Sequence, residues 1–185
     1  MTLRADVKKD PRGRKPRVAE SSFLDPTAQV IGDVVIGDEV FVGPGAVIRA
    51  DEPGSTIVIG DRCNVQDRVI IHALEGSTVK LGPETSLAHG CIVHGPCEIG
   101  AGCFVGFGSV VFKASLGDGT FVGHLAVVEG VEISAGRRVG PGCIVDSPEK
   151  AGKLGICGEE EREFVGKVVG MNLLLLRGYR EMAEG

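Results

Sequence analysis

Three histidines stand close together in an otherwise repetitive sequence, and together they could bind a metal ion. His72, His89 and His94 share one short window, whereas the fourth histidine, His124, lies well outside it. Three neutral imidazoles around one open coordination position are the ligand set of a hydrolytic zinc site. Imidazole also accepts iron(II) and cobalt, so the ligand type alone does not select the native metal.

The elements that must position these histidines follow from an aliphatic residue at every sixth position. This period fits neither an ordinary helix nor a meander of strands, and it predicts a solenoid of short strands and tight turns with three hexads per coil. The aliphatic side chains point into a narrow prism, and Gly follows many of them at the corners. The series comprises Val30, Ile36, Val42, Ile48, Ile59, Val65, Ile71, Leu81, Leu87, Val93, Ile99, Val105, Val111, Leu116, Val122, Val128, Ile133, Val139 and Val145.

A second, smaller residue two places before the aliphatic one is also expected to point inward. Five of the six cysteines occupy this position and are therefore expected to be buried free thiols that act as small hydrophobes. The sixth, Cys157, lies in a connector outside the repeat. The small inward positions are Ala28, Val34, Val40, Ala46, Cys63, Val69, Thr85, Cys91, Cys97, Cys103, Ser109, Ala126 and Cys143.

The repeat also sets the expected domain limits. Residues 21–147 form the solenoid, residues 148–158 a connector, and residues 159–185 an apolar helix that packs on the flank of the coil. Residues 1–20 are strongly basic, and we expect a disordered or draped arm, with an anion-binding or targeting arm as the alternative. The predicted fold class is an all-β solenoid with a C-terminal α-helix.

Composition excludes several classes of partner. The net charge of -5 gives a nucleic-acid partner no overall electrostatic support. The longest purely apolar run, residues 173–176, is far too short to span a bilayer. We therefore expect a soluble, cytoplasmic protein that binds neither nucleic acid nor membrane, with its thiols reduced.

The hexad count places the histidines on two faces. His72 and His94 each directly follow their aliphatic residue, so they are expected to stack about 4.8 Å apart and share one metal ion. His89 falls on the preceding face, from which it would reach the metal of a neighbouring subunit in a trimer. Arg49 and Gln66 are expected in the column of His89, where they could support the ligands or orient a substrate. The count assigns Ile48, Val65 and Leu87 to one face, and Ile71 and Val93 to the next.

From about residue 22 to residue 181, the chain resembles the gamma-class carbonic anhydrases. This resemblance implies a left-handed parallel β-helix of hexapeptide repeats that forms homotrimers. It also implies that His72 and His94 of one subunit and His89 of its neighbour bind zinc, or iron or cobalt. The segments that carry it are Ile48-Arg49-Ala50-Asp51-Glu52, Gly60-Asp61-Arg62-Cys63-Asn64-Val65-Gln66-Asp67, His72-Ala73-Leu74-Glu75, Ser86-Leu87-Ala88-His89 and Val93-His94-Gly95-Pro96.

The resemblance further implies a reaction, in which a metal-bound hydroxide attacks CO2 to give bicarbonate and a proton. Gln66 would lie near the metal-bound water, Glu52 would accept or orient its proton, and Glu75 would pass the proton to buffer. The remaining implied roles are support of the ligands by Asn64, orientation of substrate by Asn172, and interface ion pairs of Arg49 with Asp51 or Asp67.

The sequence departs from the family pattern at two places. Only Glu75-Gly76-Ser77-Thr78 stands where the prototype carries a long acidic loop, and Gly170 replaces an aromatic residue two places before Asn172. The chain is therefore similar to the short-loop subgroup, in which rapid proton export is the step in question. Three alternatives remain open: a weak or inactive scaffold or assembly relative, an acyltransferase with a single histidine base, and a metal-dependent hydrolase of another small substrate.

Overall fold

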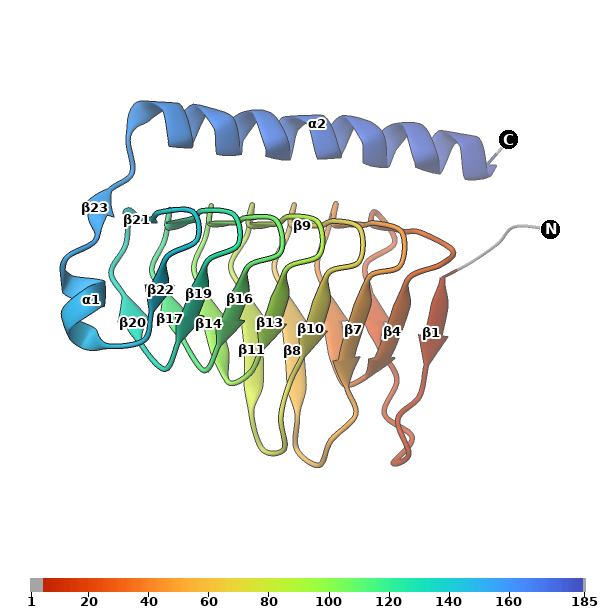
Figure 1. Cartoon of the computed structure of the whole chain (residues 1–185). Helices are drawn as coiled ribbons and strands as arrows, with labels where there is room; N and C mark the ends of the chain where they lie inside the picture. The colour runs from red at the N-terminus through yellow and green to blue at the C-terminus, as the bar shows by residue number, and fades with distance from the viewer. Residues whose placement is uncertain (1–4, 185) are drawn as a thin grey trace.

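The computed structural model describes residues 5–184, which form a left-handed parallel β-solenoid with one long helix along its side (Figure 1). Consecutive strands belong to different sheets, so three sheets enclose one narrow core. Sheet A consists of β1 (Asp6–Lys8), β4 (Gln29–Gly32), β7 (Val47–Ala50), β10 (Ile70–His72), β13 (Ile92–His94), β16 (Val110–Phe112), β19 (Val127–Glu129) and β22 (Ile144–Val145).

The other two sheets complete each coil. Sheet B consists of β2 (Arg17–Val18), β5 (Val34–Ile36), β8 (Thr56–Ile59), β11 (Thr78–Leu81), β14 (Cys97–Ile99), β17 (Ser115–Leu116) and β20 (Glu132–Ile133). Sheet C consists of β3 (Phe23–Leu24), β6 (Phe41–Val42), β9 (Asn64–Val65), β12 (Ser86–Leu87), β15 (Phe104–Val105), β18 (Phe121–Val122), β21 (Arg137–Val139) and β23 (Gly155–Ile156). Among the strands of residues 5–184, only β23 pairs antiparallel, on β21.

The core confirms the six-residue repeat. Every aliphatic residue of the series is buried, because successive residues of a strand point to opposite faces and the aliphatic one points inward. Parallel hydrogen bonds join each coil to the next, as between β10 and β13. The prism holds little besides these side chains and the small residues two places before them, which explains the scarcity of aromatic residues inside it.

The cysteines follow the prediction with one exception. Cys63, Cys91, Cys97 and Cys103 are buried in the small inward positions, and burial raises the pKa of both Cys63 and Cys91 to about 12. Cys143 is exposed, so its expected burial was wrong. It precedes β22, the last strand of sheet A, and no further coil covers it there.

Residues 5–20 belong to the solenoid, whereas the sequence predicted an arm outside it. β1 pairs with β4 and β2 pairs with β5, and Val7 and Val18 pack against the core. These two valines are the only apolar side chains in either strand, so charge obscured the pattern in the sequence. Residues 1–4 of the predicted arm lie outside the described residues.

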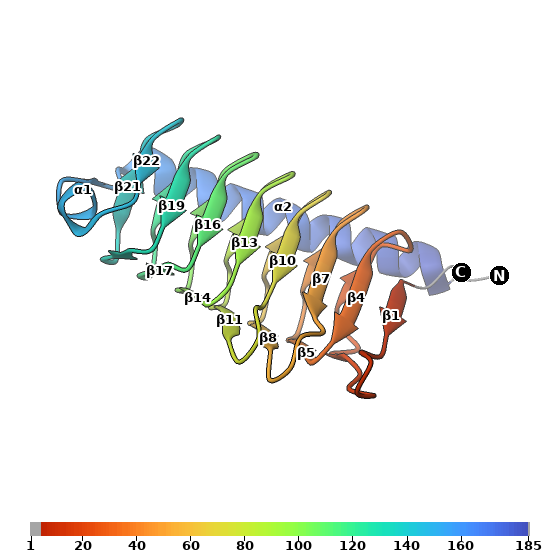
Figure 2. The same cartoon turned by 60° about the horizontal axis from the view of Figure 1, so that its bottom comes forward.

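After the last coil the chain turns back along the solenoid. The short helix α1 (Pro148–Gly152) and β23 lead into α2 (Glu159–Glu184), which runs over sheet C towards the first coil (Figures 1 and 2). Aromatic side chains of sheet C lie beneath it: Phe23 stacks on Tyr179 with ring centroids 5.0 Å apart, and Phe104 meets Phe164 at 5.2 Å. Within residues 5–184, no helix has a stretch long and apolar enough to cross a membrane.

We expect one of the six cysteines to react with a thiol reagent in the folded protein. Cys143 is exposed, whereas the other five are buried and several have a raised pKa that suppresses the reactive thiolate. Titration with Ellman's reagent before and after unfolding measures this, with Cys143→Ser as the control. Rapid reaction of the native Cys143→Ser variant would contradict the burial of the other five.

Candidate metal and substrate site

The register of sheet A places two of the predicted metal ligands together. His72 on β10 lies opposite His94 on β13, and His72 Nδ1 is 3.0 Å from His94 Nε2. Two nitrogens that bind one zinc ion lie roughly 3.3 Å apart, since each Zn–N distance is about 2.0–2.1 Å, so the pair fits a shared ion. Burial lowers the pKa of His72, and the positive charge of Arg49 lowers it further, which favours the neutral form that a metal requires.

The third predicted ligand does not join this pair within one subunit. Among residues 5–184 of a single chain, no cluster of three histidine, cysteine or acidic side chains could hold a metal ion. His89 follows β12 at the corner between sheets C and A, whereas His72 and His94 project from the face of sheet A. A three-histidine site would therefore have to draw His89 from another subunit.

Arg49 lies in the same column as His72. The hexad count assigned Arg49 to the column of His89, and that assignment was wrong. β7 pairs with β10 so that Arg49 lies opposite His72, and Arg49 Nη2 is 3.2 Å from His72 Nε2. Ile48 accordingly shares a face with Ile71 and not with Val65. The loop of residues 51–55 interrupts the hexads between β7 and β8. Because of these extra residues, counting hexads assigned the residues before the loop to the wrong face.

Carboxylates surround the outer ring nitrogen of His72. Glu52 Oε1 lies 3.4 Å from His72 Nε2, and Asp51 Oδ1 lies 3.7 Å from it. Asp51 also pairs with Arg49 Nε at 3.3 Å, one of the two ion pairs that the resemblance implied. The backbone N–H of Glu75 donates to Glu52 Oε2 at 2.6 Å, while the Glu75 side chain itself is exposed. We refer to these residues with His72 and His94 as the histidine-pair half-site.

A second group of predicted residues gathers around a groove between sheet C and α2. Gln66, Asp67, His89 and Asn172 line it together with apolar side chains of the helix. Asp67 Oδ2 lies 3.4 Å from His89 Nδ1, and the His89 side chain is 54% exposed. Within one chain, Asp67 therefore pairs with His89. We refer to these four residues as the His89 half-site.

Several polar atoms near this groove are buried without a hydrogen-bond partner in the described part of the chain. They are Gln66 Oε1, both side-chain polar atoms of Asn64, and Ser86 Oγ. His94 Nδ1, in the other half-site, is in the same state. Asn172 donates its side-chain N–H to the carbonyl of Val168 at 2.8 Å and so keeps its oxygen available. Buried polar groups normally find partners, so these atoms mark a place where a ligand is expected.

Two aromatic residues that sequence reasoning missed support the histidines. Phe107 stacks on His89 with ring centroids 5.5 Å apart, and Phe112 meets the His94 ring edge-on at 5.4 Å. Each stands three hexads after the histidine it contacts. The coil length could therefore have identified both residues.

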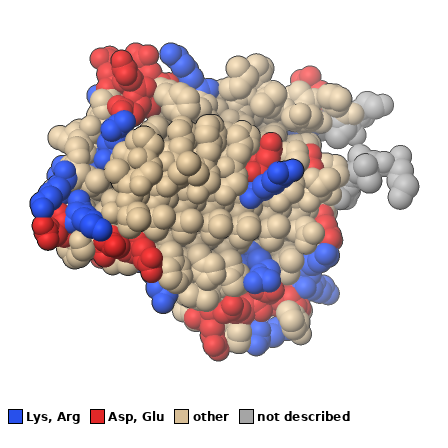
Figure 3. Space-filling view, viewed as in Figure 1, with Lys and Arg blue, Asp and Glu red and all other residues tan. Residues whose placement is uncertain are grey.

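An exposed apolar row beside the histidine column was also missed. It runs along sheet A from β7 to β22, with Ile70 41% and Ile144 58% exposed and the other members half-buried, and sheet A presents a largely uncharged surface in Figure 3. From β7 onward, the residue that precedes each inward aliphatic one on sheet A forms this row, and it could have been found by the same count. Its members are Val47, Ile70, Ile92, Val110, Val127 and Ile144.

The comparisons with known proteins agree with this architecture. A profile described as bacterial transferase hexapeptide (six repeats) matches residues 15–50 and 78–113. Among solved structures, a hexapeptide transferase family protein from Anaplasma phagocytophilum superposes with a TM-score of 0.80 at 26% identity, over 94% of this chain and 98% of that one.

Two curated relatives connect the chain to named proteins. The carboxysome assembly protein CcmM of Nostoc is 38% identical over 88% of this chain, which spans only 31% of that protein's length. The carbonic anhydrase of Methanosarcina thermophila is 35% identical, in an alignment that covers 93% of this chain and 78% of that protein. The chain therefore belongs to the hexapeptide-repeat family of left-handed β-helices that includes the gamma-class carbonic anhydrases.

Proposed function

We propose that this protein catalyses the metal-dependent, reversible hydration of carbon dioxide to bicarbonate and a proton, at sites shared between subunits of a homotrimer. The observation that carries the proposal is the division of the expected residues into two half-sites on one chain. The histidine-pair half-site lacks a third ligand, and the His89 half-site holds a single outward-facing imidazole. Each supplies what the other lacks.

The metal would be held by His72 and His94 of one subunit and by His89 of the next. Zinc is our first choice, and iron(II) or cobalt would suit the same imidazoles. When bound, the ion supplies Lewis acidity that makes a coordinated water a good nucleophile near neutral pH. The second ring nitrogens of the ligands are oriented by carboxylates of this chain that can accept their N–H: Glu52 lies against His72, and Asp67 against His89.

Glu52 is the proton acceptor in this proposal, because its carboxylate lies against His72 at the edge of the ligand pair. Gln66 presents a buried oxygen without a partner in residues 5–184, and so it could hold a hydroxyl hydrogen. Asn172 lines the groove of the His89 half-site and would orient the substrate, and the buried Asn64 would support the ligands. Glu75 is exposed on the next loop, in direct backbone contact with Glu52, and would pass protons to buffer.

The apolar row on sheet A supports the homotrimer. A flat uncharged row next to half of a metal site is suited to burial against another subunit. The His89 corner, with Phe107 43% exposed beside it, is the surface that would cover this row in a ring of three. A monomer that retains its metal in solution would contradict this arrangement.

A second candidate function is assembly, in which the trimer acts as a scaffold with little or no catalysis. The relative named carboxysome assembly protein CcmM favours it, since the match covers most of this chain but a minor part of that protein. The short connection after His72 also favours it, because it removes a long proton-exporting loop. The intact set of Glu52, Gln66 and Asn172 favours catalysis, since a scaffold has no need of these groups.

We expect His94→Ala to abolish metal retention while leaving the coil folded. His94 projects outward from β13, so its removal opens no cavity in the core. Metal content by mass spectrometry and folding by circular dichroism measure the two effects. His124→Ala is the matched control and should keep its metal. Full metal content in His94→Ala would refute the assignment of this ligand.

The proposed activity is tested by stopped-flow CO2 hydration. Protein purified without oxygen would be reloaded separately with zinc, cobalt or ferrous iron, and the His94→Ala variant would serve as the control. We expect metal-dependent turnover that is lost in the variant. Bound metal without activity in any of the three forms would contradict catalysis and favour the assembly function.

A further inference from the structure

Three loops protrude at the corner between sheets A and B, and one of them comes from the first coil. They are residues 9–16, 51–55 and 73–77, seen along the lower edge of the molecule in Figure 1. The coil between the first two turns this corner with Gly32 and Asp33 alone. Gly32 has a φ of 84°, and a Cβ there would lie 2.0 Å from the carbonyl oxygen of Ala50. The short corner leaves the loop of residues 9–16 free to reach across to residues 51–55.

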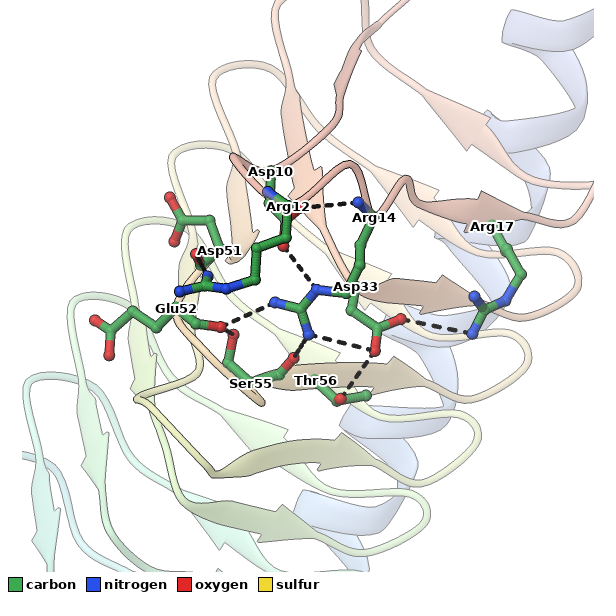
Figure 4. Close-up of polar contacts among 9 residues, drawn as sticks. All are labelled: Asp10, Arg12, Arg14, Arg17, Asp33, Asp51, Glu52, Ser55 and Thr56. Carbon is green, nitrogen blue, oxygen red and sulfur yellow. Dashed lines mark hydrogen bonds and ion pairs between the residues drawn. The ribbon is translucent and has the colours of Figure 1, made fainter.

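The loop of residues 9–16 is organised around a buried carboxylate. Asp10 is only 5% exposed, and its Oδ1 accepts hydrogen bonds from the backbone N–H groups of Arg12 and Arg14 at 2.9 and 2.8 Å. Its Oδ2 accepts from Arg14 Nε at 2.7 Å. Burial alone would raise the pKa of Asp10, but these hydrogen bonds and the charge of Arg14 hold it below its usual value. Asp10 therefore fixes the direction of the Arg14 side chain (Figure 4).

The guanidinium of Arg14 binds the backbone of the neighbouring loop, residues 51–55. Arg14 Nη2 donates to the carbonyl of Glu52 at 2.9 Å, and Nη1 donates to the carbonyl of Ser55 at 3.0 Å. The Ser55 hydroxyl, itself buried, donates to the same Glu52 carbonyl at 2.7 Å. The planar fork of a guanidinium reaches several acceptors at once, which an ammonium group does not. We name Asp10, Arg14, Glu52 and Ser55 the arginine clamp (Figure 4).

The backbone that the clamp holds carries the Glu52 carboxylate into the histidine-pair half-site. One oxygen accepts from the Glu75 N–H at 2.6 Å, and the other lies 3.4 Å from His72 Nε2. Arg14 has no contact with either histidine in the described residues. It acts on the opposite side of Glu52, on the main chain, and so determines where the loop presents the side chain.

We infer that Arg14, oriented by Asp10, is a positioning residue for Glu52. The first coil would then contribute to the geometry of the site. The expected effect of Arg14 on turnover rests on the proposed function. The placement of Glu52 by Arg14 does not rest on it. The loop of residues 51–55 is exposed at its tip, and a carboxylate on an untethered loop would sample many positions. Misplacement of a reacting group by about 1 Å can cost roughly 100-fold in rate.

The first test measures the loop without reference to activity. Amide hydrogen exchange of Glu75, whose N–H donates to Glu52, reports whether Glu52 is in place. We expect at least about 10-fold faster exchange in Arg14→Gln and in Arg14→Lys, because neither side chain reproduces the fork. Arg17→Gln is the matched control. Arg17 is exposed and forms a long ion pair with Asp33, at 3.7 Å, so its loss should leave the exchange rate of the Glu75 amide unchanged. Unchanged Glu75 exchange in both Arg14 variants would overturn the inference.

The second test separates positioning from general destabilisation by a double-mutant cycle on kcat for CO2 hydration. We expect Arg14→Lys to lower kcat about 10-fold in the wild-type background and to have little further effect in Glu52→Gln, because both changes act through one carboxylate. Equal losses in the two backgrounds would overturn the inference. An inactive wild-type protein would refute the proposed function, and hydrogen exchange would then decide on the arginine clamp alone.

Discussion

The parallel register between β10 and β13 is the constraint on which the rest of the site depends. Ile71 and Val93 point into the prism with no exposed surface, so the next residues, His72 and His94, must point outward one above the other. A slip of one residue would send both imidazoles into the core. The histidine pair thus inherits its precision from the backbone hydrogen bonds of the coil and from the packing of the narrow core, whereas Glu52 is presented by a loop.

The same rigidity explains why the expected site residues are divided between two surfaces. The backbone of a three-sided coil is too rigid to bring His89 around the corner towards sheet A. His89 instead contacts Asp67 and Phe107 on its own face. Buried polar atoms of Asn64 and Gln66 stay without partners in residues 5–184, although each such group costs about 1–3 kcal/mol. Sequences retain such costs mainly where function requires the groups.

Much of this architecture could be predicted from the sequence, because a six-residue period maps directly onto inward and outward positions. The aliphatic core and the stacking of His72 on His94 followed from that period alone. Arg49 was assigned to the wrong column, because the loop of residues 51–55 adds length that a count of hexads cannot place. The first coil was missed since only Val7 and Val18 mark its strands among charged residues, and its contacts with Glu52 are long-range.

The division of the site between subunits is measured most directly by subunit complementation. His89→Ala and His94→Ala chains with different affinity tags would be co-expressed, and the mixed trimers isolated by both tags. Neither variant should bind metal alone, yet every mixed ring of three contains an intact pair of half-sites, so about one metal ion per mixed trimer is expected, with about one third of the wild-type activity. Mixed trimers without metal, or metal retained in either variant alone, would contradict the shared site.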